Sequence, residues 1–122
     1  MLEGELYRLV SLERVEDSVS ATVALRSGSV IYEAHFKGMP ITPGVCLIQI
    51  VTELVSKAEG RSMNLIGAKD IKFVQPVIPS EVSELNFSLK LATCDQTAQT
   101  WQAAITGKDT LRAKMTLTYS ER

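Results

Sequence analysis

The chain has 122 residues, of which 45% are hydrophobic. That length and content suit the core of one globular domain, and we expect residues 1–122 to form it. The 13 basic and 14 acidic side chains leave a formal net charge of -1. This balance predicts neither a nucleic-acid-binding surface nor a polybasic membrane patch.

The first residues are acidic where a signal peptide would be basic, and no apolar run approaches the roughly 20 residues of a membrane span. We therefore expect a cytoplasmic protein that does not enter the membrane. Cys46 and Cys94 lack CxxC spacing, and His35 is the chain's single histidine. These features predict two reduced thiols and no metal site.

The N-terminal part of the chain carries strand patterns. A strand is expected around residues 6–12. In residues 18–25 apolar and small polar side chains alternate with the period of two that is typical of a half-buried strand. Two N-terminal strands are therefore predicted.

A long amphipathic helix is predicted next. Thr42 suits its N-cap, Pro43 its first turn, and the Glu59-Gly60 pair its end. At 100° per residue one arc is apolar, with Leu47, Ile48, Ile50, Val51, Leu54, Val55 and Ala58. The opposite stripe is polar, with Gln49, Thr52, Glu53, Ser56 and Lys57.

Three antiparallel strands are predicted at the C-terminal end. Residues 85–91 and 111–119 both alternate in hydropathy, and residues 107–109 favour a hairpin that joins the last strand to one containing Trp101. A single long helix must bury its apolar stripe against the sheet. The sequence therefore predicts an α+β domain of two layers.

The segment from His35 to Glu53 reads HFKGMPITPGVCLIQIVTE. It resembles HFPGxPxxPGVLxxEAxAQ, the signature of the bacterial 3-hydroxyacyl-[acyl carrier protein] dehydratase family (FabZ/FabA-like). The later block FVQPVIP, residues 73–79, is similar to the family's FxxPVxPGD, with Ser80 in place of the usual glycine. The resemblance implies a hot-dog fold, in which a curved antiparallel sheet wraps a long central helix.

The resemblance also implies a reaction and a set of site residues. The family removes water from a 3-hydroxyacyl thioester in fatty-acid or polyketide-type synthesis. The substrate is carried on the phosphopantetheine of acyl carrier protein or coenzyme A, and no other cofactor is implied. By this resemblance the catalytic residues are His35, Gly44 and Gln49. The candidate substrate-binding residues are Pro43 at the helix opening, and Phe36, Val45 and Glu53 close to the matched positions.

Dehydration of a 3-hydroxyacyl thioester needs a base for the C2 proton and an acid for the departing hydroxyl. His35 suits the base, because imidazole titrates near neutral pH. The amides of Gly44 and Val45, in the first helical turn, can polarise the thioester carbonyl. Gln49 occupies the position of the family's acidic residue, and its amide can orient a hydroxyl but has no proton to donate.

Glu53 stands where many relatives carry glutamine, so the acid and the amide look exchanged along the helix. It is a possible substitute acid, although a glutamate on a polar stripe is more often a solvated charge. Burial would raise its pKa and favour the acid role.

Two other functions stay open, a non-catalytic acyl-thioester-binding subunit and a hot-dog thioesterase. The non-catalytic subunit would contribute His35 to a composite site with a partner hot-dog protein, whereas a self-sufficient enzyme would be a homodimer. We expect this state because two-fold pairing would cover the long helix and an edge strand.

Overall fold

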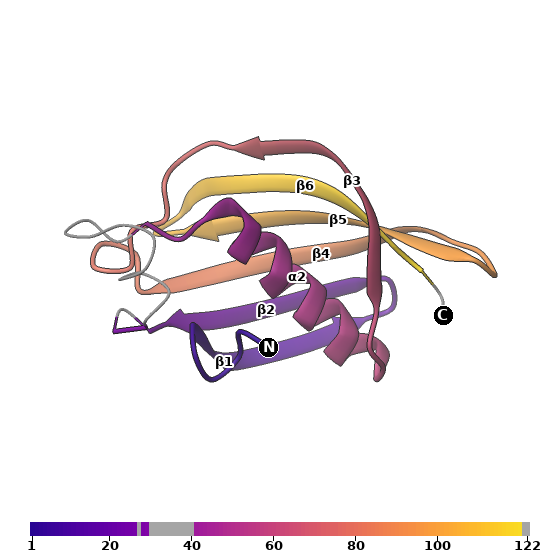
Figure 1. Cartoon of the computed structure of the whole chain (residues 1–122), viewed down its shortest axis with the longest axis horizontal. Helices are drawn as coiled ribbons and strands as arrows, with labels where there is room; N and C mark the ends of the chain where they lie inside the picture. Colours follow the sequence, from indigo (N-terminus) through magenta and orange to yellow (C-terminus); the bar gives the residue numbers. More distant parts are fainter. Residues whose placement is uncertain (27, 30–40, 121–122) are drawn as a thin grey trace.

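One helix lies across one face of a six-stranded sheet in this computed structural model, which describes residues 1–26, 28–29 and 41–120 (Figure 1). The sheet order is β1-β2-β4-β5-β6-β3, and every neighbouring pair is antiparallel. The α+β prediction is confirmed. In chain order the elements are β1 (Tyr7–Val15), β2 (Ser18–Leu25), α2 (Gly44–Glu59), β3 (Asn64–Phe73), β4 (Glu84–Cys94), β5 (Ala98–Gly107) and β6 (Thr110–Ser120).

The predicted C-terminal hairpin joins β5 to β6. Its two turn residues, Lys108 and Asp109, have φ values of 49° and 59°. Two consecutive positive φ values match the right-handed twist of the flanking strands, which is why such turns are common in tight hairpins. Gly107 and Thr110 close the ladder on either side of the turn.

The core fills the space between α2 and the inner face of the sheet. Alternate residues of β2, β4, β5 and β6 point to this face, as the pleat requires. Fully burying a side chain such as Ile50 or Leu54 contributes about 1.5–3 kcal/mol each. The buried residues of α2 are Cys46, Leu47, Ile50, Val51, Glu53, Leu54 and Val55.

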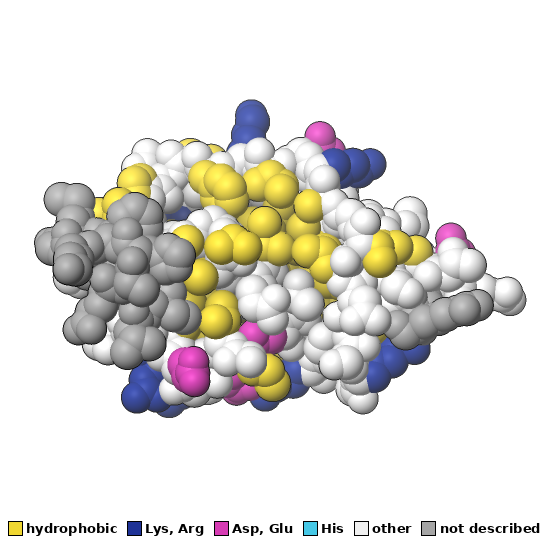
Figure 2. Space-filling model, viewed as in Figure 1, with side chains coloured by type: hydrophobic (Ala, Val, Ile, Leu, Met, Phe, Trp, Pro, Cys, Tyr) yellow, Lys and Arg dark blue, Asp and Glu magenta, His cyan; other side chains and the backbone are white. Residues whose placement is uncertain are grey.

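Strand β3, which the hydropathy pattern did not predict, forms one edge of the sheet. It pairs only with β6 in the described structure, through two register shifts, and Asp70 between them has a φ of 52°. Most of its side chains are exposed, so it lacks the alternation of a half-buried strand. Figure 2 shows hydrophobic side chains gathered on the face of the molecule that carries α2 and β3. Exposed large hydrophobic residues in or next to these elements are Val45, Leu65, Ile66, Ile71, Phe73 and Val74.

Candidate functional site

Helix α2 begins one residue later than the sequence predicted. Pro43 is the N-cap, with extended backbone angles, and Gly44 is the first helical residue. Thr42 lies before the cap and donates its backbone N–H to the Val77 carbonyl at 2.8 Å. The assignment of Thr42 as N-cap and of Pro43 to the first turn was therefore wrong, because Pro43 keeps an extended backbone and the helix begins only after it. The N–H groups of Gly44 and Val45 come too early in the helix to have an intrahelical acceptor.

A cavity of about 300 Å³ opens at this end of the helix. Phe73 packs against Gly44 so closely that a Cβ added to the glycine would lie 2.5 Å from the ring. Phe73 is 54% exposed, so its ring can move aside more readily than a core side chain. Gly44 therefore permits close approach to the helix amides. The cavity is lined by Ile41, Thr42, Pro43, Gly44, Leu47, Phe73, Val74, Gln75, Pro76 and Val77.

Glu53 is buried, with 6% of its surface exposed. The expectation of a solvated charge was wrong, because the N-terminal segment of the chain covers this side of α2. The carboxylate accepts four hydrogen bonds, from the Leu2 N–H at 2.8 Å, the Glu3 N–H at 3.0 Å, the Tyr7 hydroxyl at 2.9 Å and Gln49 Nε2 at 2.9 Å.

The contacts of Glu53 decide its ionisation. Burial raises the pKa of the Glu53 carboxyl, but the four hydrogen bonds together lower it by more. The net pKa therefore lies below its ordinary value. The expectation that burial would raise the pKa of Glu53 was therefore wrong. Burial, together with the hydrogen bond to Glu53, raises the pKa of Tyr7 above its ordinary range. At neutral pH Glu53 is thus a carboxylate and Tyr7 a neutral donor, an arrangement in which Glu53 carries no proton to give.

The structure divides the predicted site residues into two groups. Pro43 and Gly44 line the cavity at the helix end, whereas Gln49 and Glu53 form a hydrogen-bonded pair further along α2. Val45 is 69% exposed beside the cavity. His35 and Phe36 lie outside the described residues, so their roles stay predictions. Sequence reasoning missed Tyr7 and the N-terminal segment, because no local motif connects them to α2.

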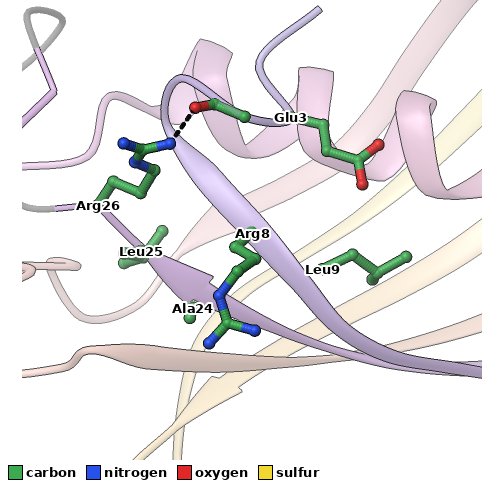
Figure 3. A pocket seen from close by; sticks show the side chains of 7 residues that line it. Glu3, Arg8, Leu9, Ala24, Leu25 and Arg26 are labelled. Carbon is green, nitrogen blue, oxygen red and sulfur yellow. Dashed lines mark hydrogen bonds between the residues drawn. The ribbon is translucent and has the colours of Figure 1, made fainter.

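Among the described residues, two larger hollows lie elsewhere, and neither is lined by a predicted site residue. One, of about 590 Å³, lies where β1 meets the end of β2, and in it the Arg26 guanidinium donates to the Gly4 carbonyl while Arg8 points away (Figure 3). The other, of about 870 Å³, extends over β3 to β6 and includes Lys72, Lys90 and Lys114.

The part of the chain that the structure describes contains neither a metal-binding cluster nor a candidate membrane-spanning helix. No three His, Cys, Asp or Glu side chains there lie close enough together to hold a metal ion. No helix within the same residues is long and apolar enough to cross a membrane. Both cysteines are free thiols, Cys46 buried and Cys94 exposed.

Solved structures share this architecture at low sequence identity. The dehydratase heterocomplex ApeI:P from Xenorhabdus doucetiae aligns with a TM-score of 0.73 at 15% identity, over 94% of this chain and 98% of that one. A hypothetical thioesterase with coenzyme A from Streptococcus pneumoniae aligns with a TM-score of 0.65 at 14% identity, over 96% and 89%. These likenesses concern the fold. They define the protein as one of the hot-dog class, as the resemblance implied.

Within that class the chain belongs to the ApeI-like family, described as ApeI dehydratase, whose profile matches residues 11–113. Curated relatives include the 3-hydroxyacyl-[acyl-carrier-protein] dehydratase FabZ of Clostridium acetobutylicum, 27% identical over 68% of this chain and 67% of that protein. FabZ of Enterococcus faecalis is 28% identical over 60% and 56%. The resemblance to FabZ-like dehydratases is thus confirmed, although the match to the second relative spans little more than half of its length.

Proposed function

We propose that this protein removes water from a 3-hydroxyacyl thioester carried on the phosphopantetheine of acyl carrier protein or coenzyme A. The observation that carries the proposal is the cavity at the start of α2, where the Gly44 amide lacks an intrahelical acceptor. A thioester carbonyl placed there would meet helix N–H groups and the positive end of the helix dipole. Membership of a dehydratase family favours this reaction over others that use the same fold.

The proposed elimination moves one proton through the protein. His35 takes the C2 proton, the C2–C3 double bond forms as the C3–O bond breaks, and the departing hydroxyl receives a proton to leave as water. Neither Gln49 nor the ionised Glu53 supplies that proton, so His35 returns the one it captured. Gln49 orients the hydroxyl. Phe36, Pro43 and Val45 are the proposed walls of the acyl site.

A homodimer is part of the proposal. Strand β3 is an edge whose apolar side chains are exposed, and Val45 on α2 is exposed beside it. An edge of this kind invites pairing with a second copy, which would also cover the hydrophobic patch in Figure 2. The carrier, the fatty-acid or polyketide-type pathway, the homodimer and the cytoplasmic location stay predictions.

Mass spectrometry tests the reaction directly. Purified protein is incubated with 3-hydroxyacyl thioesters of acyl carrier protein and of coenzyme A, and we expect product that has lost the mass of one water. His35→Ala should abolish this product while leaving thermal unfolding unchanged. Full activity in His35→Ala would remove His35 from the site, and no product with the wild type on either carrier would reject a self-sufficient dehydratase.

A second candidate is an acyl-thioester-binding subunit whose acid comes from a different protein. The observation that favours it is the amide at Gln49 beside a carboxylate whose oxygens are already engaged. One structural neighbour is a dehydratase heterocomplex, which supports a two-protein assembly as the alternative. A third reading, a hot-dog thioesterase, would release free acid in place of water in the same mass spectra.

A further inference from the structure

The carboxylate of Glu53 is buried and ionised, so it acts neither as a solvated surface charge nor as a proton donor. We infer that Glu53 is a positioning residue that holds Gln49 by its amide nitrogen, so that the Gln49 carbonyl oxygen is the atom offered to the substrate. The inference rests on the proposed function, because it concerns how the same site recognises the C3 hydroxyl.

The orientation of the Gln49 amide follows from hydrogen-bond chemistry. An ionised carboxylate only accepts, so the end of the amide that lies 2.9 Å from Glu53 Oε2 must be the NH₂ group. The carbonyl oxygen is then at the other end, on a side chain that is exposed. Within the described residues no other partner holds the Gln49 side chain. Its carbonyl is therefore available as an acceptor.

Glu53 is rigid enough to impose that orientation. Its other three hydrogen bonds come from the Leu2 and Glu3 amides and from Tyr7, which is 1% exposed. Glu3 in turn forms an ion pair with Lys57, one turn further along α2, at 3.0 Å. The carboxylate is thus fixed between the N-terminal segment and the helix. A free glutamine could flip its amide, whereas this one would lose a charge-assisted hydrogen bond by flipping.

An acceptor in this place selects among acyl thioesters. A C3 hydroxyl can donate to the Gln49 carbonyl, whereas a C3 ketone presents a second acceptor and is repelled. Polar groups matched to a substrate hydroxyl discriminate strongly against analogues that lack it. We therefore expect the site to prefer a 3-hydroxyacyl over a 3-oxoacyl thioester, and Glu53 to maintain that preference although it does not touch the substrate.

Amide NMR tests the contact without any turnover. In ¹⁵N-labelled wild-type protein the Gln49 side-chain resonances are assigned by their loss in Gln49→Leu. We expect a Gln49 Nε2 proton to exchange at least about 10-fold more slowly than those of Gln102, an exposed glutamine on β5. The Gln49 resonances should also shift when acid protonates Glu53. Exchange as fast as that of Gln102, with no such shift, would overturn the inference.

Binding measurements test the consequence for recognition. The affinities of 3-hydroxyoctanoyl and 3-oxooctanoyl coenzyme A are compared in a His35→Ala background, which prevents turnover. We expect the hydroxy form to bind at least about 10-fold more tightly, and Glu53→Gln to bring the ratio close to one. Tyr7→Phe is the matched control, because it removes one hydrogen bond from the same carboxylate and leaves the Gln49 contact in place.

The outcomes separate this inference from the proposed function. A ratio that survives in Glu53→Gln, or that falls equally in Tyr7→Phe, overturns the positioning role. If Glu53→Gln does not fold, Glu53→Asp replaces it, because its shorter carboxylate draws back from Gln49 and should lower the preference. If neither thioester binds, the proposed function fails together with the substrate part of this inference. The exchange rates then still decide whether Glu53 holds Gln49.

Discussion

Helix α2 carries two glutamates, and each holds the amide of a glutamine. Glu53 accepts from Gln49 Nε2 at 2.9 Å, and Glu59 accepts from Gln99 Nε2 at 2.8 Å. The second glutamine is only 3% exposed, and its carbonyl oxygen accepts from the indole N–H of Trp101 at 2.8 Å. In both pairs the carboxylate fixes the nitrogen end of the amide.

The difference lies at the other end of each amide. The Gln99 carbonyl is used inside the protein, where it satisfies a buried indole N–H. The Gln49 side chain is exposed, so its carbonyl is presented outward. The same pair of side chains therefore serves packing in one place and, in our proposal, recognition in the other.

The largest expected effect is a loss of folding stability when Glu53 is replaced. Glu53→Ala leaves two backbone N–H groups and the Tyr7 hydroxyl without their acceptor, so we expect a loss of about 2–4 kcal/mol. Glu59→Ala should cost less, about 1–2 kcal/mol, because only Gln99 among its partners is buried, whereas Arg14 and Arg61 can turn to solvent. Urea denaturation measures both. A larger loss at Glu59 would show that the N-terminal segment contributes little.

The second comparison exchanges each glutamine for leucine. Gln99→Leu removes the acceptor of the buried Trp101 indole and should cost about 1–3 kcal/mol. Gln49→Leu changes an exposed side chain and should stay within about 0.5 kcal/mol of wild type. The dehydration rate should respond in the opposite order, with a larger loss in Gln49→Leu than in Gln99→Leu. Equal stability losses in the two variants would argue that Gln49 also serves the fold.

A third prediction adds an acid to the outward-facing pair. In Gln49→Glu two carboxyl groups would lie within hydrogen-bond distance, which raises the pKa of the pair so that they share a proton. That proton can be given to the departing hydroxyl, so we expect the dehydration rate to rise about 10-fold. The gain should disappear as pH rises through the raised pKa, because only the protonated pair donates.

The double exchange Gln49→Glu with Glu53→Gln is the control for that gain. It restores one acid and one amide, with the acid at the position that the resembled family uses. A flat or lower rate in Gln49→Glu would show that the added carboxyl does not deliver its proton to the departing hydroxyl. Loss of activity in Glu53→Gln does not identify Glu53 as the donor, because the positioning role also predicts that loss.

The helix and five of the six strands follow from local patterns, and β3 shows where those patterns stop. Alternation reveals a strand only when one of its faces is buried. In β3 most side chains are exposed, and the shifts around Gly67 and Asp70 interrupt its register. Its position at the sheet edge depends on pairing with β6, a contact between distant segments that hydropathy does not encode.

Glu53 shows the corresponding limit for the site. Glu53 lies seven positions after Cys46, so on an ideal helix the two lie about 20° apart. Cys46 is buried, and this neighbour was the available signal that Glu53 borders the buried arc. The sequence does not show which segment of the chain packs over Glu53. The Leu2 and Glu3 amides reach Glu53 across about 50 residues of chain, so the ionised state of this carboxylate follows only from the folded structure.

The smallest expected effect is a difference in how strongly salt changes the stability that Glu53 and Glu59 contribute. The pKa of each carboxyl is lowered in the folded protein, so each contributes stability above the ordinary glutamate pKa of about 4.3. That stability is lost as pH falls through the folded-state pKa. The donors to Glu53 are uncharged, whereas part of the shift at Glu59 comes from Arg14 and Arg61.

Salt screens charges and leaves hydrogen bonds from neutral groups largely intact. Raising the salt concentration to about 1 M should therefore reduce the contribution of Glu59 by about 0.2–1 kcal/mol, and leave that of Glu53 nearly unchanged. The measurement is urea denaturation of wild type, Glu53→Gln and Glu59→Gln at pH 4 and pH 7, at low and high salt. Equal salt sensitivity of the two contributions would mean that Glu53 also depends on a nearby charge, and Lys57, which pairs with Glu3, would be the first to replace.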